Sequence, residues 1–202
     1  MNEKKNIFDI CIIGGLGHVG LPFGIYLAEK KLKVCCYDNN KELLKKVKKG
    51  EMPYIEHNSD KLLNKNIKNK NLSFSSDPNS ISVSSTVIIA IGTPVDEYLN
   101  PKISDFLENI KALKPFFRES QLVIVRSSVF PKTCQKILKI LAENINLDLA
   151  YCPERIVQGS AFSELEKLPQ IVAGFSDNAK KRAGKLFSLV TRKIIYTSIG
   201  EA

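Results

Sequence analysis

Three glycines near the N-terminus have the spacing of a phosphate-binding loop. Gly15, Gly17 and Gly20 form the pattern Gly-x-Gly-x-x-Gly, directly after an apolar run and directly before an expected helix. In such a loop the first glycine permits a tight turn, the second lets the backbone approach a pyrophosphate, and the third lets the helix pack on the strand. Backbone N–H groups at the helix start then bind the phosphates, assisted by the helix dipole. We expect His18 and Val19 to border these phosphates.

An acidic residue follows the second apolar run at the distance expected for a ribose-binding acid. Asp38 lies 18 residues beyond Gly20, at the end of the run 33–37. Its carboxylate is suited to accept hydrogen bonds from the adenosine ribose hydroxyls and to repel a 2′-phosphate. Asn39 and Asn40 follow, where an NADP-binding protein more often has Arg. The pattern predicts NAD as the cofactor; the alternative is that Asp38 is only a turn residue or the N-cap of the next helix.

The elements that must position these residues alternate along the whole chain. Short runs rich in Ile and Val, alternating with amphipathic stretches, predict an α/β fold with a mostly parallel sheet and helices on both faces. Together with the glycine loop, this order indicates a Rossmann-type, doubly wound domain over residues 1–198. The expected strands are 7–13, 33–37, 72–75, 87–91, 122–125, 147–152, 170–173 and 193–197, and the expected helices are 19–30, 41–49, 59–68, 104–117, 133–143 and 179–190.

The composition limits the classes of function. Hydrophobic residues make up 44% and charged residues 25% of the 202 residues, as in an ordinary soluble globular protein. The net charge of +9 is compatible with nucleic-acid binding, but only five of the 30 basic residues are arginine. The lysines are scattered, and no aromatic-interleaved stripe or zinc finger accompanies them. We therefore expect no nucleic-acid partner and no membrane partner, although the positive potential would help to gather an anionic substrate.

The five cysteines fit a reducing compartment. Cys11, Cys35 and Cys36 lie in apolar runs and are interpreted as small buried hydrophobes, whereas Cys134 and Cys152 are isolated. No CxxC pair or His spacing suggests a zinc site, so no metal is expected. The N-terminus lacks the apolar region and cleavage site of a signal peptide. These features predict free thiols and a cytoplasmic protein.

Five ordered segments together resemble one family, the UDP-glucose/GDP-mannose dehydrogenases, also called nucleotide-sugar 6-dehydrogenases. The resemblance runs through essentially the whole chain. Its segments are GLGHVGLP (15–22), KGEMPYIE (49–56), GTPVD (92–96), RSSVFP (126–131) and YCPERIVQG (151–159), the last followed by Glu164 and Leu165. The Pro-Glu-Arg sequence resembles the UDP-N-acetyl-D-mannosamine and UDP-N-acetylglucosamine dehydrogenase branch. UDP-glucose and GDP-mannose enzymes more often have an Asn-Pro-Glu-Phe type of sequence there.

The resemblance implies roles for residues that follow the ends of predicted strands, the edge where ligands bind in open parallel sheets. Thr93 and Ser128 would offer hydroxyls to the cofactor or to a catalytic water. Glu154 would position that water or act as a base in thioester hydrolysis. Arg155 would supply a cation for a UDP-sugar and Ile156 an apolar or backbone contact.

Each of these residues also has a plainer interpretation. Thr93 and Pro94 are compatible with a simple turn, and Ser127 and Ser128 with caps for the helix expected near Pro131. Glu154 and Arg155 are compatible with a surface ion pair.

The chain departs from the family pattern at several positions. The family often has Tyr where His18 stands, Thr where Ser128 stands, Gly where Lys132 stands, and Arg or Lys where Leu43 stands. The family also continues past position 202 into a helix with a catalytic Lys and Asn, a Gly-rich loop with a nucleophilic Cys, and a second nucleotide-binding domain. Residues 199–202 are then expected to begin the linker to this helix and to the second domain. The chain alone is expected to be inactive.

The function implied for the whole protein is NAD-dependent oxidation of the C6 alcohol of a UDP-N-acetylhexosamine to the uronic acid. UDP-N-acetyl-D-mannosamine is the expected substrate, two NAD are consumed, and the product enters surface polysaccharide. The resemblance implies a homodimer or larger assembly. Three alternatives stay open: a non-catalytic NAD-binding module, a UDP-glucose 6-dehydrogenase, and a 3-hydroxyacid-type Rossmann dehydrogenase.

Overall fold

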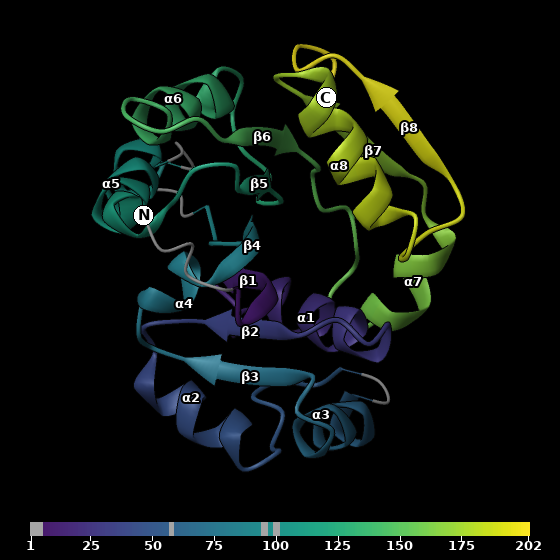
Figure 1. Ribbon diagram of the computed structural model, residues 1–202. Helices are drawn as coiled ribbons and strands as arrows, with labels where there is room; N and C mark the ends of the chain where they lie inside the picture. The colour runs from purple at the N-terminus through teal and green to yellow at the C-terminus, as the bar shows by residue number, and fades with distance from the viewer. Residues whose placement is uncertain (1–5, 57–58, 94–96, 99–101) are drawn as a thin grey trace.

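A computed structural model shows an α/β fold built on one eight-stranded sheet (Figure 1). It describes residues 6–56, 59–93, 97–98 and 102–202. The strands are β1 (Phe8–Ile13), β2 (Val34–Tyr37), β3 (Leu72–Ser75), β4 (Ser84–Ile89), β5 (Leu122–Val125), β6 (Asp148–Tyr151), β7 (Gln170–Gly174) and β8 (Ile194–Thr197). The helices are α1 (Gly20–Glu29), α2 (Lys41–Lys48), α3 (Ser59–Lys68), α4 (Asn79–Ser82), α5 (Ile103–Leu113), α6 (Thr133–Leu141), α7 (Ala161–Lys167) and α8 (Asp177–Phe187), with a 3-10 turn η1 (Lys114–Phe116) after α5.

The strand order confirms the Rossmann-type fold that the sequence predicts. The order is β3-β2-β1-β4-β5-β6-β7-β8, and the first six strands of this series are parallel. β7 runs antiparallel to β6, and β8 is parallel to β7. The connections change direction between β1 and β4, and ligands of such sheets bind outside the carboxyl ends of the strands at this switch point.

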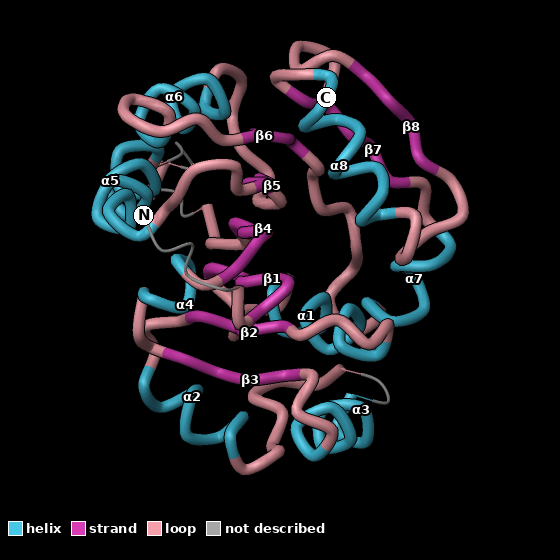
Figure 2. The backbone as a smooth tube through the Cα atoms, viewed as in Figure 1, coloured by secondary structure: helices cyan, strands magenta, loops and turns pink. Residues whose placement is uncertain are grey.

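Helices cover both faces of the sheet. Figure 2 shows α1, α7 and α8 on one side and α4, α5 and α6 on the other. Alternate residues of each inner strand enter separate apolar clusters: Ile12 packs with α1 and α8 residues, whereas Ile13 packs with residues of α5 and α6. All four residues of β5 are buried, as expected for a central strand of a sheet covered on both faces.

The starts of α2 and α6 show how local sequence sets the helix boundaries. Asn40 caps α2, because its side-chain oxygen accepts hydrogen bonds from the N–H groups of Glu42 and Leu43. Lys132 precedes α6 in a left-handed backbone conformation, with φ of 68°. No side chain caps α6, so the interpretation of Ser127 and Ser128 as its caps is wrong.

In the part of the chain that the structure describes, no helix is long and apolar enough to cross a membrane. Over the same residues, no group of three or more His, Cys, Asp or Glu side chains is placed to hold a metal ion.

Candidate cofactor and substrate site

The glycine loop joins the end of β1 to α1 and packs tightly on its surroundings. The left-handed turn falls on Gly14, with φ of 76°, rather than on Gly15, to which the sequence pattern had assigned it. Gly15 instead lies against β2, since a Cβ there would be 2.7 Å from the Cα of Cys36. A Cβ on Gly20 would lie 2.3 Å from the carbonyl oxygen of Gly14. The helix can therefore begin this close to the loop only with glycine at position 20.

Gly17 is the open position of the loop. A Cβ there would meet only the carbonyl oxygen of Gly14, at the ordinary contact distance of 3.5 Å. Folding alone therefore does not require glycine at this position. A ligand that approaches the backbone closely would require it, because a side chain would block the approach.

Asp38 lies at the end of β2 with its carboxylate directed to the glycine loop. One carboxylate oxygen accepts a hydrogen bond from the N–H of Leu16 at 3.1 Å, and the other accepts one from the N–H of Asn40 at 3.0 Å. Because Asn40 caps α2, the alternative role of Asp38 as that N-cap is wrong. A carboxylate has about four acceptor positions, so Asp38 retains two for ribose hydroxyls.

A broad groove opens at the switch point, beside Gly17 and Asp38. Its walls come from the ends of β1, β2 and β4 and from α5, as the fold predicts for an adenosine site. The lining residues are Ile13, Gly14, Gly17, Tyr37, Asp38, Asn39, Ala90, Ile91, Gly92, Asn109, Ala112 and Leu113.

Thr93 and Ser128 are exposed beyond the ends of β4 and β5. The Ser128 hydroxyl donates a hydrogen bond of 3.5 Å to the carbonyl oxygen of Glu154, so the loops after β5 and β6 lie side by side. The rest of the Gly-Thr-Pro-Val-Asp segment, residues 94–96, lies outside the described residues.

The segment 49–56 folds back over the glycine loop. The Tyr54 hydroxyl donates a hydrogen bond of 2.8 Å to the carbonyl oxygen of Gly17, and its ring lies 4.0 Å from the ring of exposed His18, centroid to centroid. Burial raises the pKa of Tyr54 well above its usual value, which keeps its hydroxyl a donor. His18 is thus held at the rim of the loop, with Val19 half-buried beside it.

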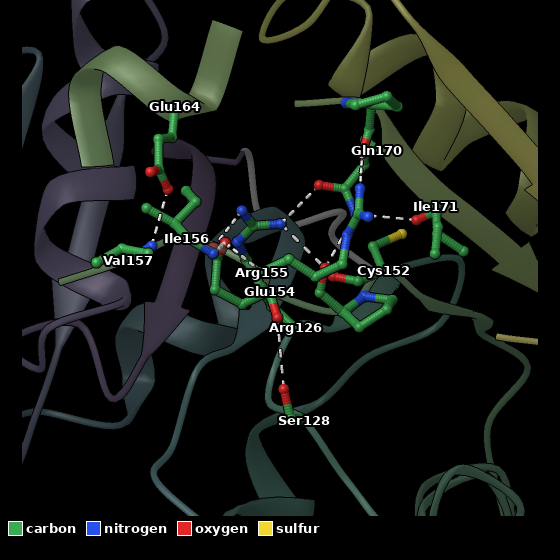
Figure 3. Close-up of polar contacts among 12 residues, drawn as sticks. Arg126, Ser128, Cys152, Glu154, Arg155, Ile156, Val157, Glu164, Gln170 and Ile171 are labelled. Atoms are coloured by element: carbon green, nitrogen blue, oxygen red, sulfur yellow. Dashed lines mark hydrogen bonds and ion pairs between the residues drawn. The ribbon is translucent and has the colours of Figure 1, made fainter. Parts of the chain in front are cut away.

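Glu154 organises the loop that follows β6 (Figure 3). Its Oε1 accepts hydrogen bonds from the N–H groups of Arg155 at 2.7 Å and Ile156 at 2.9 Å, and its Oε2 forms an ion pair with Arg126. Only 10% of the Glu154 side chain is exposed. The interpretation of Glu154 and Arg155 as a surface ion pair is therefore wrong.

The two predicted substrate-binding residues lie in different surroundings. Arg155 is exposed, and its guanidinium donates to the carbonyl oxygen of Pro169, whereas half-buried Ile156 packs on the apolar core. Ile156 and Glu154 line a small cavity together with His18 and Val19 of the glycine loop. The structure thus brings the loop after β1 and the loop after β6 to one place.

Two charged residues at this place lie in segments of the family resemblance, but the sequence analysis assigns them no role. Arg126, the first residue of the segment RSSVFP, is 1% exposed directly after β5. Glu56, 6% exposed, accepts hydrogen bonds from the N–H groups of Gly159 at 3.0 Å and Ala161 at 2.9 Å. Glu56 therefore ties the segment over the glycine loop to the start of α7.

A family model described as "UDP-glucose/GDP-mannose dehydrogenase family, NAD binding domain" matches residues 8–194. The chain belongs to this family. Its NAD-binding domain is the part present here, which confirms both the resemblance and the predicted cofactor. The match counts against the 3-hydroxyacid type of dehydrogenase.

Curated and solved relatives place the chain within the family. A UDP-N-acetyl-D-mannosamine dehydrogenase of Methanococcus aeolicus is 30% identical over 200 residues, covering 96% of this chain and 45% of the relative. The structure of a UDP-D-ManNAc dehydrogenase from Pyrococcus horikoshii superposes with a TM-score of 0.86 at 27% identity, over 96% of this chain and 47% of that one. The UDP-N-acetyl-mannosamine dehydrogenase Cap5O from Staphylococcus aureus superposes with a TM-score of 0.85 at 27% identity, over 96% of this chain and 48% of that one. The chain thus spans about half the length of these relatives.

The residues present fit the cofactor of the family. The tight turn at Gly14, the open position at Gly17 and Asp38, which keeps free acceptor positions, all line the groove. An adenosine ribose and a pyrophosphate need this combination of an acid and exposed loop backbone.

All five cysteines of this NAD-binding domain are free and buried, whereas the sequence predicts burial only for Cys11, Cys35 and Cys36. Cys152 lies closest in sequence to Glu154, and burial raises the pKa of its thiol far above the usual value. A buried, protonated thiol is a poor nucleophile.

Proposed function

We propose that the chain is the NAD-binding part of a nucleotide-sugar 6-dehydrogenase that acts on a UDP-N-acetylhexosamine. The proposed substrate is UDP-N-acetyl-D-mannosamine, and the product serves surface polysaccharide synthesis. One observation carries this proposal: the glycine loop and the loop containing Glu154, Arg155 and Ile156 line the same cavity. That cavity adjoins the cofactor loop on the side of the sheet where β5 and β6 end. The relatives reported above, named as UDP-N-acetyl-mannosamine dehydrogenases, support the choice of sugar.

The protein's share in cofactor binding follows from the groove. NAD supplies the hydride acceptor, and the net reaction is R–CH₂OH + 2 NAD⁺ + H₂O → R–COO⁻ + 2 NADH + 3 H⁺. Asp38 binds the adenosine ribose, and the loop from Gly15 to Gly20 holds the pyrophosphate with backbone N–H groups. Thr93 and Ser128 would offer their hydroxyls to the nicotinamide end, because they follow β4 and β5 on the same edge.

Glu154 is proposed to serve the hydrolytic half of the reaction. Its carboxylate uses three acceptor positions, two on backbone N–H groups and one on Arg126. A carboxylate has about four such positions, so one remains to hold the attacking water. A carboxylate in this place can orient or deprotonate water, but it cannot accept hydride.

Arg155 and Ile156 are proposed to contact the UDP-sugar. The Arg155 guanidinium is exposed and has N–H groups left for a phosphate after its contact with Pro169. Ile156 presents its backbone and an apolar surface to the cavity. Turnover would further need an accessible thiol. Because all five thiols here are buried, the chain alone is proposed to bind NAD without oxidising the sugar, as in the alternative of a non-catalytic module.

Titration calorimetry on the purified chain tests this proposal. We expect NAD to bind more tightly than NADP, and UDP-N-acetylmannosamine to bind the NADH-loaded chain more tightly than UDP-glucose does. Arg155→Met should weaken binding of the UDP-sugar and leave NAD affinity unchanged, with Arg192→Met, on an exposed surface residue, as the matched control. Absence of NAD binding, or sustained NADH production by the chain alone, would contradict the proposal.

A further inference from the structure

Arg126 is a buried cation to which the proposed function gives no role. It follows β5 directly, and its guanidinium has polar partners in the loop after β6 and in β7. One Nη pairs with Glu154 in the loop after β6, and the other donates a hydrogen bond of 3.0 Å to the side-chain oxygen of Gln170 in β7. A fully buried charge that serves packing alone is costly, so these contacts call for an explanation.

Two aromatic rings contact this guanidinium. Its central carbon lies 4.2 Å from the ring centroid of Phe23 in α1 and 5.3 Å from that of Phe187 in α8. The two rings are themselves stacked, with centroids 5.8 Å apart. Cation–π contact of this kind is strengthened where water is absent. The two rings therefore help to hold the cation in place independently of Glu154.

Glu154, the partner of Arg126, holds the backbone of residues 154–156 by hydrogen bonds. While Oε2 of Glu154 faces Arg126, Oε1 accepts the N–H groups of Arg155 and Ile156. The backbone N–H of Glu154 also donates to the carbonyl oxygen of Arg126 at 3.0 Å. One carboxylate thus links the guanidinium to the conformation of residues 154–156, and loss of the cation would leave that carboxylate without a counter-charge at 10% exposure.

Arginine suits this position better than lysine. Its planar fork has separate N–H groups for Glu154 and Gln170, while its central carbon lies over the ring of Phe23. A lysine ammonium would keep the charge, but it cannot satisfy the three contacts in this arrangement.

We infer that Arg126 is a positioning residue: its guanidinium fixes the Glu154 carboxylate, and through it the backbone at Arg155 and Ile156, in the orientation that the reaction uses. The inference rests on the proposed function of the 154–156 loop. Arg126 itself acts through Glu154, since its side chain is 1% exposed. The same contacts join the loop to α1, which starts at the glycine loop, and to α8.

Hydrogen exchange on the full 202-residue chain, measured amide by amide with NMR, tests this inference. In Arg126→Met the amides of Arg155 and Ile156 should exchange about 10- to 100-fold faster, which corresponds to loss of one charge-assisted hydrogen bond. In Arg126→Lys, which keeps the charge and should fold even if Arg126→Met does not, the acceleration should be smaller but measurable. Core amides of β5, such as that of Ile124, report global stability and should accelerate less than the loop amides do.

Arg182→Met is the matched control. Arg182 also pairs with an acid, Asp148, at 2.7 Å, but it lies on α8 away from the loop. This variant should leave the Arg155 and Ile156 amides unchanged relative to the core. Unchanged loop amides in both Arg126 variants, or an acceleration no greater than that of the β5 amides, would overturn the inference. NAD affinity is measured separately on the unmodified chain, so failure of the proposed function would appear there and not in the exchange comparison.

Discussion

The Asp38 carboxylate accepts a hydrogen bond from the backbone N–H of Leu16, at 3.1 Å. This contact joins the end of β2 to the glycine loop before any ligand arrives. The acid expected to bind the ribose and the backbone expected to bind the phosphates are therefore fixed relative to each other, which lowers the ordering cost of binding a rigidly spaced ligand.

Asp38→Ala should weaken NAD binding about tenfold, because charge-assisted hydrogen bonds to the ribose are lost. NADP binding should fall less or improve, because the repulsion of its 2′-phosphate is also removed. Calorimetric titration with both cofactors measures the gap. Asn40→Ala is the control: it removes the cap of α2 and should cost stability without changing the preference. A full preference for NAD retained in Asp38→Ala would show that another residue makes the selection.

Gly17→Ala and Gly20→Ala should separate binding from folding. The Cβ at position 17 meets only an ordinary contact of 3.5 Å, so Gly17→Ala should keep the wild-type denaturation midpoint but lose most NAD affinity. The Cβ at position 20 would lie 2.3 Å from the carbonyl oxygen of Gly14. Gly20→Ala should therefore cost about 1–3 kcal/mol or more in unfolding free energy, the range for overpacking. Urea denaturation and NAD titration on both variants check this, and tight NAD binding by Gly17→Ala would refute the assigned role.

Lys132→Gly should stabilise the protein. Lys132 occupies a left-handed conformation with φ of 68° before α6, which costs a residue with a Cβ about 1–2 kcal/mol. Relief of part of this strain should raise the melting temperature by about 2–4 °C. Lys132→Ala keeps the Cβ and removes only the charged stem, so it should show no comparable gain. Equal melting temperatures for the two variants would contradict the explanation by strain.

Alkaline pH should destabilise the protein partly through Cys134. Burial raises the pKa of this thiol from 9.0 to about 12, so the native state favours the protonated form. This contribution is fully present below the unfolded pKa and is lost as the pH rises from about 9 toward 12, at about 1.4 kcal/mol per pH unit. Urea denaturation of Cys134→Ala at pH 8 to 10.5 should show a shallower loss than wild type. Identical slopes would mean that Cys134 does not carry this dependence.

Local patterns predicted the parts of the site that are formed locally. The glycine spacing and Asp38 lie within one βαβ unit, so the fold fixes their separation. All eight strands were predicted, although β4 begins earlier than expected because Ser84, Ser85 and Thr86 continue it as polar residues. Helices α4 and α7 were missed, since four and seven residues are too few for a clear helical period.

The missed residues of the site depend on distant partners. Arg126 bonds to Gln170, 44 positions away, and Glu56 to Gly159, 103 positions away. Neither partner is recognisable from residue types near the charged side chain. An arginine after a buried strand and a glutamate after a turn are ordinary on any surface. Only the antiparallel return of β7 beside β6 brings Gln170 into reach of Arg126.

The contact of Glu56 with Gly159 and Ala161 also bears on the order in which the chain folds. It closes a loop of more than one hundred residues, so its entropic cost is met only after the strands between these segments have paired. Contacts that form after the transition state affect unfolding rather than folding rates. Loss of the hydrogen bonds of Glu56 would therefore speed unfolding and shorten the lifetime of the folded protein, while the folding rate would stay nearly the same.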